Sequence, residues 1–160
     1  MTGLTVAQVL TREHREIDAG IEEFLAGLDR GEVHPEPLRT AFAALQRHIY
    51  VEEEYLFPPI RQAGLMMPIM VMVREHGTLW KQMAEITHLL DTDEALPVDG
   101  PVVQRCRELL GQLDQHNSKE EPIIYPHTAT EITEPDAAAV IELLDSGKTP
   151  EGWVCEEANV

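Results

Sequence analysis

The sequence has few cysteines, few basic side chains and no long apolar run. It holds two cysteines, Cys106 and Cys155, in 160 residues, which excludes a disulfide framework and favours a reducing compartment. Asp and Glu number 29 against 12 Lys and Arg, a net charge of −17 that argues against nucleic acid and anionic membrane surfaces as partners. No apolar stretch approaches the roughly 20 residues that span a bilayer. Since no signal peptide precedes the amphipathic pattern at Thr5, we expect a cytoplasmic protein, monomeric or weakly homodimeric.

Apolar residues recur at helical spacing through most of the chain, and no segment alternates like a strand. Four such stripes start near Thr5, Pro35, Pro68 and Pro101, and the second is predicted to end at Pro58-Pro59. Their connections, at 30–36, 61–67 and 92–100, are short and turn-like. This pattern predicts an all-α protein, an antiparallel up-down four-helix bundle.

A shorter fifth helix is predicted over 134–146, because Thr133 can cap its start and Gly147 can end it. Residues 148–160 have no periodicity and are predicted to form an extended tail, with Trp153 docking on the bundle. We therefore expect residues 1–130 to form the bundle and residues 131–160 to pack against it as a short helix and a tail.

One pattern occurs twice in the sequence. His48-Ile-Tyr-Val-Glu52-Glu53 is followed by Phe57-Pro58, and His116-Asn-Ser-Lys-Glu120-Glu121 is followed by Tyr125-Pro126. Each copy comes after an Arg-Glu-His tripeptide, at residues 12–14 and 74–76. Residues four apart share a face of a helix, so each His-x-x-x-Glu presents an imidazole and a carboxylate in one direction.

Six titratable residues of this pattern interrupt the apolar stripes, at positions that should face inward. Buried imidazoles and carboxylates are costly unless they are paired or bound to metal. Counting residues from the predicted turns at 1.5 Å per residue places all six within one or two helical turns of a common layer. The six residues are His14, His48, Glu52, His76, His116 and Glu120.

Four imidazoles and two carboxylates suit a two-metal centre. The donor set favours Fe, Mn or Zn over Ca or Mg, and no thiolate is present to favour a structural zinc site. Any one of these histidines alone could be a hydrogen-bonded core residue, and a metal-free interaction bundle is the third reading of the sequence. Glu53, Glu54 and Glu121 are expected to be solvated or to contact metal-bound imidazoles. Surface positions are expected for His34, His88 and His127. Cys106 is interpreted as a packing residue, and the methionines as packing or channel-lining residues.

On these motifs, the sequence over about residues 5–126 resembles the hemerythrin-like (HHE cation-binding) domain family. The resemblance implies a centre of two non-haem iron ions with an oxo or hydroxo bridge, in preference to Mn or Zn. It implies as metal ligands His14, His48, Glu52, His76, His116 and Glu120, with both carboxylates bridging the irons. Small molecules such as O2, NO or peroxide are the implied partners.

The sequence departs from the oxygen-carrying members of that family on the third helix. Those proteins have a further histidine one turn after the first, where this chain has Trp80, so reversible oxygen carriage is not expected. We expect a redox, gas or iron sensor or binding protein. The alternative is a di-iron enzyme that removes peroxide or nitric oxide, or that delivers iron for iron–sulfur cluster repair; the cysteine-bearing domain typical of the repair proteins is not found ahead of His14.

Overall fold

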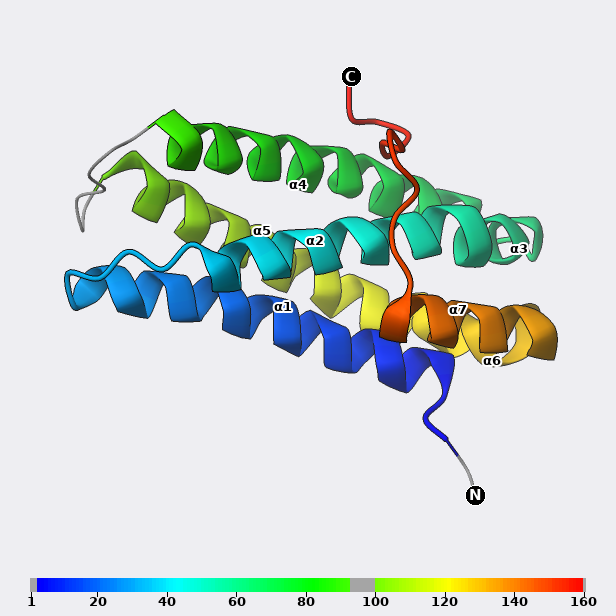
Figure 1. Ribbon diagram of the computed structural model, residues 1–160. Coiled ribbons are helices and arrows are strands. Elements are labelled where there is room, and N and C mark those ends of the chain that lie inside the picture. Colours follow the sequence, from blue (N-terminus) through cyan, green and yellow to red (C-terminus); the bar gives the residue numbers. More distant parts are fainter. Residues whose placement is uncertain (1–2, 93–99, 160) are drawn as a thin grey trace.

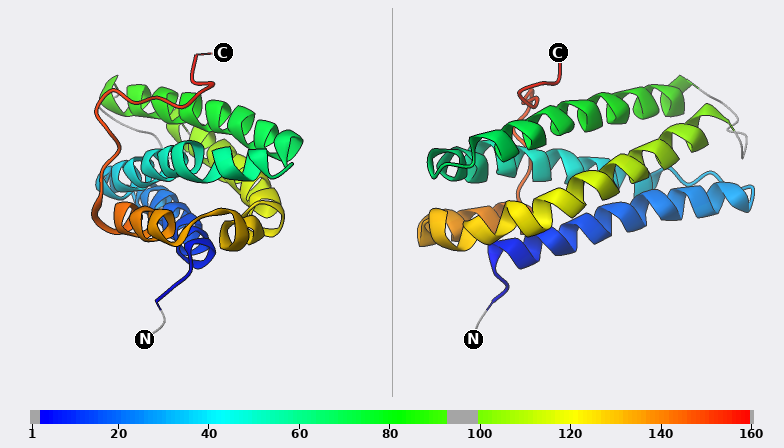
Figure 2. Two further views of the ribbon diagram at one scale, coloured as in Figure 1. Left: turned by 90° about the vertical axis from the view of Figure 1, so that its right-hand side faces the viewer. Right: turned by 180° about the vertical axis from the view of Figure 1, so that it is seen from behind.

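The computed structural model describes residues 3–92 and 100–159, and within these ranges it contains helices and no strand. The long helices pack side by side as a bundle (Figures 1 and 2), which confirms the all-α prediction. The elements are α1 (Val6–Asp29), α2 (Glu36–Val51), the π-helical turn η1 (Glu52–Leu56), α3 (Phe57–Gln62), α4 (Met66–Thr92), α5 (Pro101–Ile123), the 3-10 turn η2 (Tyr125–His127), α6 (Thr128–Glu131) and α7 (Glu134–Ser146). None of the described helices is long and apolar enough to span a membrane.

Local sequence signals set the helix ends. The Thr5 hydroxyl accepts a bond from the Gln8 amide, and the Gln8 side chain accepts one from the Thr5 amide, which forms a capping box at the start of α1. Thr133 caps α7 in the same way through the amide of Asp136. The predicted fifth helix is thereby confirmed, with the bounds expected. The predicted turn over 92–100 lies mostly outside the described residues.

The prediction that the second helix ends at Pro58-Pro59 is wrong. The chain stays helical to Gln62, because one wide π-helical turn separates α2 from α3. In this turn the Phe57 amide bonds to the Glu52 carbonyl, five residues back. The two prolines then fall in the first turn of α3, where a missing backbone N–H costs little. The sequence therefore contains a helix start where a helix end was predicted.

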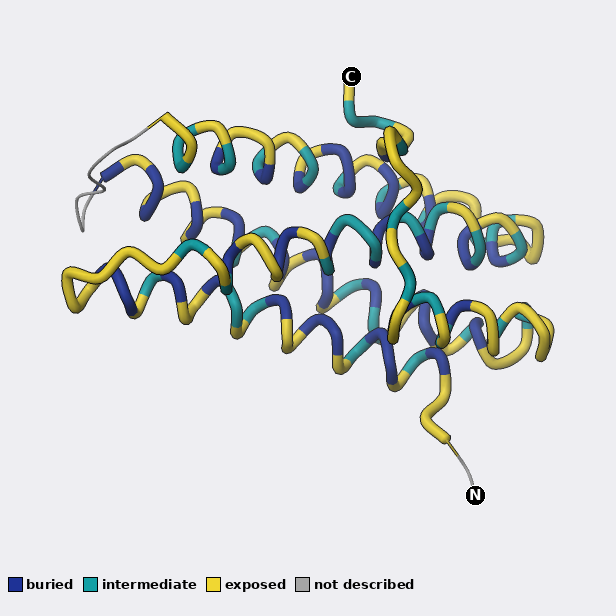
Figure 3. The backbone as a smooth tube through the Cα atoms, viewed as in Figure 1, coloured by how far each residue is buried: buried dark blue, intermediate teal, exposed yellow. Residues whose placement is uncertain are grey.

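Two apolar clusters fill the bundle, and a polar layer separates them. One cluster includes Ile17, Leu45 and Leu113, and the other includes Leu10 and Val51. The buried positions follow the inner side of every long helix (Figure 3). Between the clusters, buried polar side chains come from α1, α2, η1, α4 and α5. The flanking clusters therefore shield this layer from water on both sides.

The residues after α7 cross α2 and reach α4 (Figure 1). Trp153 packs edge-on against Tyr50 and Trp80, with ring centroids 5.1 and 5.5 Å apart. Gly77 of α4 lies so close to Glu157 that an added Cβ would stand 2.6 Å from the Glu157 carbonyl oxygen. The tail thus docks on the bundle through Trp153, as the sequence suggested, and through a close backbone contact that the sequence did not reveal.

Candidate metal centre

The six predicted residues meet in the polar layer as two overlapping groups of buried side chains. In each group, one nitrogen or oxygen atom per residue lies within 4.8 Å of the others. Glu52 and Glu120 belong to both groups and turn one oxygen towards each. The first cluster is His14, His48, Glu52 and Glu120, and the second cluster is Glu52, His76, His116 and Glu120.

The first cluster brings four atoms into a ring. The Nε2 atoms of His14 and His48 are 3.0 Å apart. His48 Nε2 is 3.2 Å from Glu52 Oε2, and His14 Nε2 is 3.2 Å from Glu120 Oε1. The two imidazoles come from α1 and α2, and the carboxylates come from η1 and α5.

The second cluster repeats this arrangement with the other pair of imidazoles. His76 Nε2 lies 3.1 Å from Glu52 Oε1, and His116 Nε2 lies 3.3 Å from Glu120 Oε2. The imidazoles come from α4 and α5. The duplicated sequence motif therefore corresponds to a duplicated spatial arrangement in which two carboxylates are shared.

Each imidazole is oriented by a second, outer carboxylate. The Nδ1 atoms lie 2.7–2.9 Å from a carboxylate oxygen in all four cases. A carboxylate can only accept, so Nδ1 carries a proton, and in the neutral imidazole Nε2 presents its lone pair inward. The four pairs are His14 with Glu121, His48 with Glu13, His76 with Glu53 and His116 with Glu75.

The outer carboxylates follow the sequence repeat. Glu13 and Glu75 are the middle residues of the two Arg-Glu-His tripeptides, and Glu53 and Glu121 are the second residues of the two Glu-Glu pairs. Glu53 and Glu121 were expected to be either solvated or in contact with imidazoles, and the structure shows the contacts; Glu13 and Glu75 were missed. Their signal was the tripeptide itself, whose glutamate recurs in front of both histidines.

Two of these outer carboxylates also accept hydrogen bonds from basic side chains. Arg47 donates to Glu13 at 3.0 Å, and Lys119 donates to Glu75. Burial raises the pKa of Glu13, but His48 and Arg47 lower it further, so the net pKa is below its usual value. The hydrogen bond from His116 is the main cause that lowers the pKa of Glu75 to about 2, against an opposing effect of burial. Both groups therefore stay ionised at neutral pH.

The inner groups have strongly shifted pKa values. Burial lowers the pKa of His116, but the charge of Glu120 and contacts with Glu120 and Glu75 outweigh it and raise the pKa to about 10. The same balance of burial against carboxylate contacts raises the pKa values of His48 and His76. The clustered carboxylates thus stabilise positive charge in this layer. Protons on the imidazoles supply that charge when no other cation is present.

Among the six candidate ligands, three buried atoms have no hydrogen-bond partner, and all three face the second cluster. They are Glu52 Oε1, His76 Nε2 and Glu120 Oε2. Two of them, His76 Nε2 and Glu52 Oε1, lie 3.1 Å apart but outside hydrogen-bond geometry. Unpaired buried polar atoms are costly, and converging lone pairs of nitrogen and carboxylate oxygen are what a divalent cation binds. The residues present therefore fit a metal ion.

One further residue reaches the first cluster, and the sequence interpretation missed it. The buried Tyr125 hydroxyl donates to Glu52 Oε2 at 2.7 Å or to Glu120 Oε1 at 2.8 Å. It also lies 2.9 Å from His14 Nε2 and 3.0 Å from His48 Nε2. Burial, with the negative charges of Glu120 and Glu52, raises the pKa of this phenol well above its usual value. The signal in the sequence was the one difference between the matched dipeptides, Phe57-Pro58 and Tyr125-Pro126.

The remaining singled-out residues lie away from the clusters. His34 and His88 are exposed and His127 is partly exposed, as expected. Glu54 accepts a hydrogen bond from the Trp153 indole. Cys106 and Cys155 are free and buried, and burial raises the pKa of each thiol to about 12. Neither cysteine is a reactive thiolate at neutral pH.

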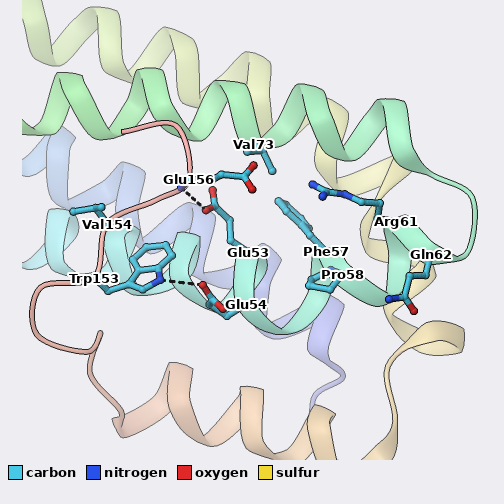
Figure 4. A pocket seen from close by; sticks show the side chains of 10 residues that line it. All are labelled: Glu53, Glu54, Phe57, Pro58, Arg61, Gln62, Val73, Trp153, Val154 and Glu156. Carbon is cyan, nitrogen blue, oxygen red and sulfur yellow. Dashed lines mark hydrogen bonds between the residues drawn. The ribbon is translucent and has the colours of Figure 1, made fainter. Parts of the chain in front are cut away.

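A cavity of about 500 Å3 opens beside the second cluster, between η1, α3, α4 and the tail (Figure 4). Glu53 and Phe57 line this cavity, and both also contact His76: Glu53 by the hydrogen bond to Nδ1, and Phe57 by stacking at a centroid distance of 5.4 Å. Trp153 and Glu156 of the tail line the same cavity. The cavity thus ends one side chain away from the second cluster.

Comparison with known protein families agrees with this geometry. Residues 5–128 match the family model of the hemerythrin HHE cation binding domain. Comparison with curated proteins and with solved structures finds no significant match. The matched segment covers most of the chain and includes all six residues of the two clusters. Hence the resemblance seen in the sequence is confirmed, and the chain belongs to the family of hemerythrin HHE cation-binding domains.

Proposed function

We propose that this protein holds two iron ions and serves as a redox, gas or iron sensor or binding protein for a small ligand such as O2, NO or peroxide. The proposed metal ligands are the two imidazoles of each cluster together with the two shared carboxylates, namely His14, His48, Glu52, His76, His116 and Glu120. Iron bound there would supply reversible redox chemistry and open coordination positions.

The observation that carries this proposal is the set of three unpaired atoms in the second cluster. A buried carboxylate oxygen and a buried imidazole nitrogen without partners are stable together when a cation lies between them. The outer carboxylates support the same conclusion, since each fixes the tautomer that leaves Nε2 free to bind metal.

Oxygen carriage is not proposed. Trp80, at the position where oxygen carriers have a further histidine, packs against Trp153 of the tail. Among the described residues, the imidazoles of the second cluster are those of His76 and His116, and a small ligand could take a further position on that side. We expect exposure of the reduced protein to O2 to oxidise it, with no long-lived, reversible oxygenated form.

The direct test is metal content. Protein produced with ample iron should contain two iron ions per chain by mass spectrometry, and His48→Ala or Glu120→Ala should lose at least one. His88→Ala removes an exposed imidazole and is the matched control. One or no metal in the wild type, or two metals in either cluster variant, would contradict the proposed ligand set.

A second measurement separates sensing from catalysis. NO or peroxide is added to the reduced protein, and its spectrum and the consumption of the added molecule are followed together. A sensor or binding protein should change its spectrum once and consume about one equivalent of ligand. Sustained consumption over many equivalents would replace this proposal with a detoxifying enzyme.

A further inference from the structure

The Tyr125 hydroxyl faces the first cluster, where more polar atoms surround it than the single hydroxyl proton can bond to. Its oxygen lies 2.7–3.0 Å from four atoms, two carboxylate oxygens and two imidazole nitrogens. Because Nδ1 of each imidazole is committed to an outer carboxylate, the facing Nε2 atom is an acceptor in the neutral form that binds metal. In that form, four acceptors converge on a hydroxyl that has one proton to donate.

The four atoms have the spacing of ligands around a metal ion. Three neighbouring separations in the ring measure 3.0, 3.2 and 3.2 Å. A square of that side has its centre about 2.2 Å from each corner, the length of a metal bond to nitrogen or oxygen. The Tyr125 oxygen lies 2.7–3.0 Å from all four atoms, close to the separations between neighbouring atoms of the ring, as expected for a further ligand of the same metal ion.

The second cluster has an equivalent ring without a hydroxyl. Phe57 stacks on His76 with a centroid distance of 5.4 Å, as Tyr125 stacks on His14 at 5.5 Å. The two aromatic residues occupy matching places in the sequence repeat. The three unpaired buried atoms all lie on the Phe57 side. The aromatic ring that stacks on the first cluster therefore carries a hydroxyl, and the ring that stacks on the second cluster does not.

We propose that Tyr125 is a seventh protein ligand, whose phenol oxygen binds the metal ion of the first cluster. This inference rests on the proposed di-iron function and deepens it. On binding, the O–H bond breaks and its proton passes to solvent, while the oxygen donates a lone pair to the metal. The first metal is then closed by protein groups, and the second metal, beside Phe57 and the 500 Å3 cavity, is the one that an external small ligand can reach.

The number of tyrosines makes this proposal easy to test. The chain has three, Tyr50, Tyr55 and Tyr125. Tyr50 and Tyr55 contact each other and Tyr50 contacts Trp153, on the outer side of the bundle. A phenolate bound to ferric iron has an intense charge-transfer absorption in the visible region, and excitation in that band enhances the phenolate Raman vibrations. Any such signal can be assigned by substitution alone.

The experiment loads metal-free protein with ferrous iron, oxidises it, and records iron content, visible absorption and resonance Raman spectra. The wild type should show the phenolate signal. Tyr125→Phe, which keeps the stacked ring, should lose the signal completely, and the double variant Tyr50→Phe/Tyr55→Phe should retain it in full. Circular dichroism confirms that each variant is folded.

The possible failures are distinct. Two irons per chain without a phenolate signal, or a signal that survives in Tyr125→Phe, would overturn the assignment of Tyr125 and leave the six-residue centre intact. A wild type that binds no iron would overturn both this inference and the proposed function. In the first case Tyr125 would be only a hydrogen-bond donor to Glu52 and Glu120.

Discussion

At the scale of single residues, the centre depends on which imidazole nitrogen carries the proton. Each Nδ1 donates to an outer carboxylate, and two of those carboxylates are held in turn by Arg47 and Lys119. The ring orientation is therefore fixed before any metal arrives. Such a preorganised arrangement reduces the conformational entropy that metal binding would otherwise cost.

Replacement of Glu13 by Gln should weaken metal binding without removing a ligand. Glu13 accepts the Nδ1 proton of His48 at 2.9 Å, and a neutral amide is a weaker acceptor than a carboxylate. Loss of an outer partner of this kind costs roughly 10- to 100-fold in metal affinity. Competition with a chelator of known affinity measures the change. Glu16→Gln, an exposed residue on the same helix, is the control, and an unchanged affinity for Glu13→Gln would contradict the role given to the outer carboxylates.

Replacement of Asp18 by Asn should stabilise the protein at neutral pH. Burial and the charge of Glu22 raise the pKa of Asp18 to about 6, and its Oδ1 is buried without a partner. The pKa of Asp18 in the folded protein is above its unfolded value of 3.8, so protonated Asp18 contributes to the stability of the fold. This contribution is full below pH 3.8 and is lost as the pH rises through 6. The melting temperature of Asp18→Asn should thus exceed that of the wild type at pH 7 and approach it near pH 4. Glu23→Gln on the exposed face should show no such crossover.

The residues of the centre could be predicted from the sequence where a polar side chain interrupts the apolar stripe of a helix. The six inner residues interrupt helical stripes, so their inward positions could be predicted from spacing. Glu13 and Glu75 lie beside those stripes, and only the folded contact across two helices shows what they bind. Tyr125 comes after the end of α5, where periodicity no longer places a side chain.

At the scale of elements, the turn η1 positions the shared carboxylate Glu52 and the aromatic Phe57 on the same side of the chain. A π-helical turn holds one residue more than an α-helical turn, so every residue after it is rotated relative to the residues before it. Helix periodicity assumes a constant rotation per residue and cannot show such an insertion. This is why Pro58 was taken as the end of a helix, although it begins α3.

Replacement of Gly77 by Ala should detach the tail from α4. A Cβ at this position would stand 2.6 Å from the Glu157 carbonyl oxygen, so the tail backbone must move. Cys155, which is 2% exposed and lies two residues before Glu157, should then react faster with a thiol reagent, whereas Cys106 in the core should stay unreactive.

Gly111→Ala provides the matched control for this change. Gly111 is an exposed glycine in α5 with open space around it, and alanine there should stabilise the protein by roughly 0.5–1 kcal/mol through helix propensity. Its Cys155 should react at the wild-type rate. Equal thiol reactivity in Gly77→Ala and wild type would show that the Gly77–Glu157 contact does not hold the tail.

At the scale of the whole molecule, metal-free and metal-loaded forms should respond oppositely to pH. The folded pKa of His116 is about 10, above the ordinary 6.5. Its contribution to the stability of the metal-free protein is therefore full below pH 6.5 and is lost as the pH rises through 10. Metal requires neutral imidazole, so occupancy should fall as the pH is lowered through the histidine range.

Thermal denaturation at pH 6 and pH 9, with and without iron, tests this expectation. The gap in melting temperature between the two forms should widen at the higher pH. A metal-free protein whose melting temperature rises from pH 6 to pH 9, or metal occupancy that persists unchanged to about pH 4, would show that the imidazoles are not governed by the carboxylates around them.

The crossing of carboxylates between the two halves of the chain has a mechanical consequence. Glu52 from the first half contacts His76 of the second, and Glu120 from the second half contacts His14 of the first. Ions bound between these groups would cross-link the two halves of the helical bundle. A single peptide cut at the exposed turn residue Gly64 would then leave two fragments that stay joined while the ions remain, and that separate when a chelator removes them.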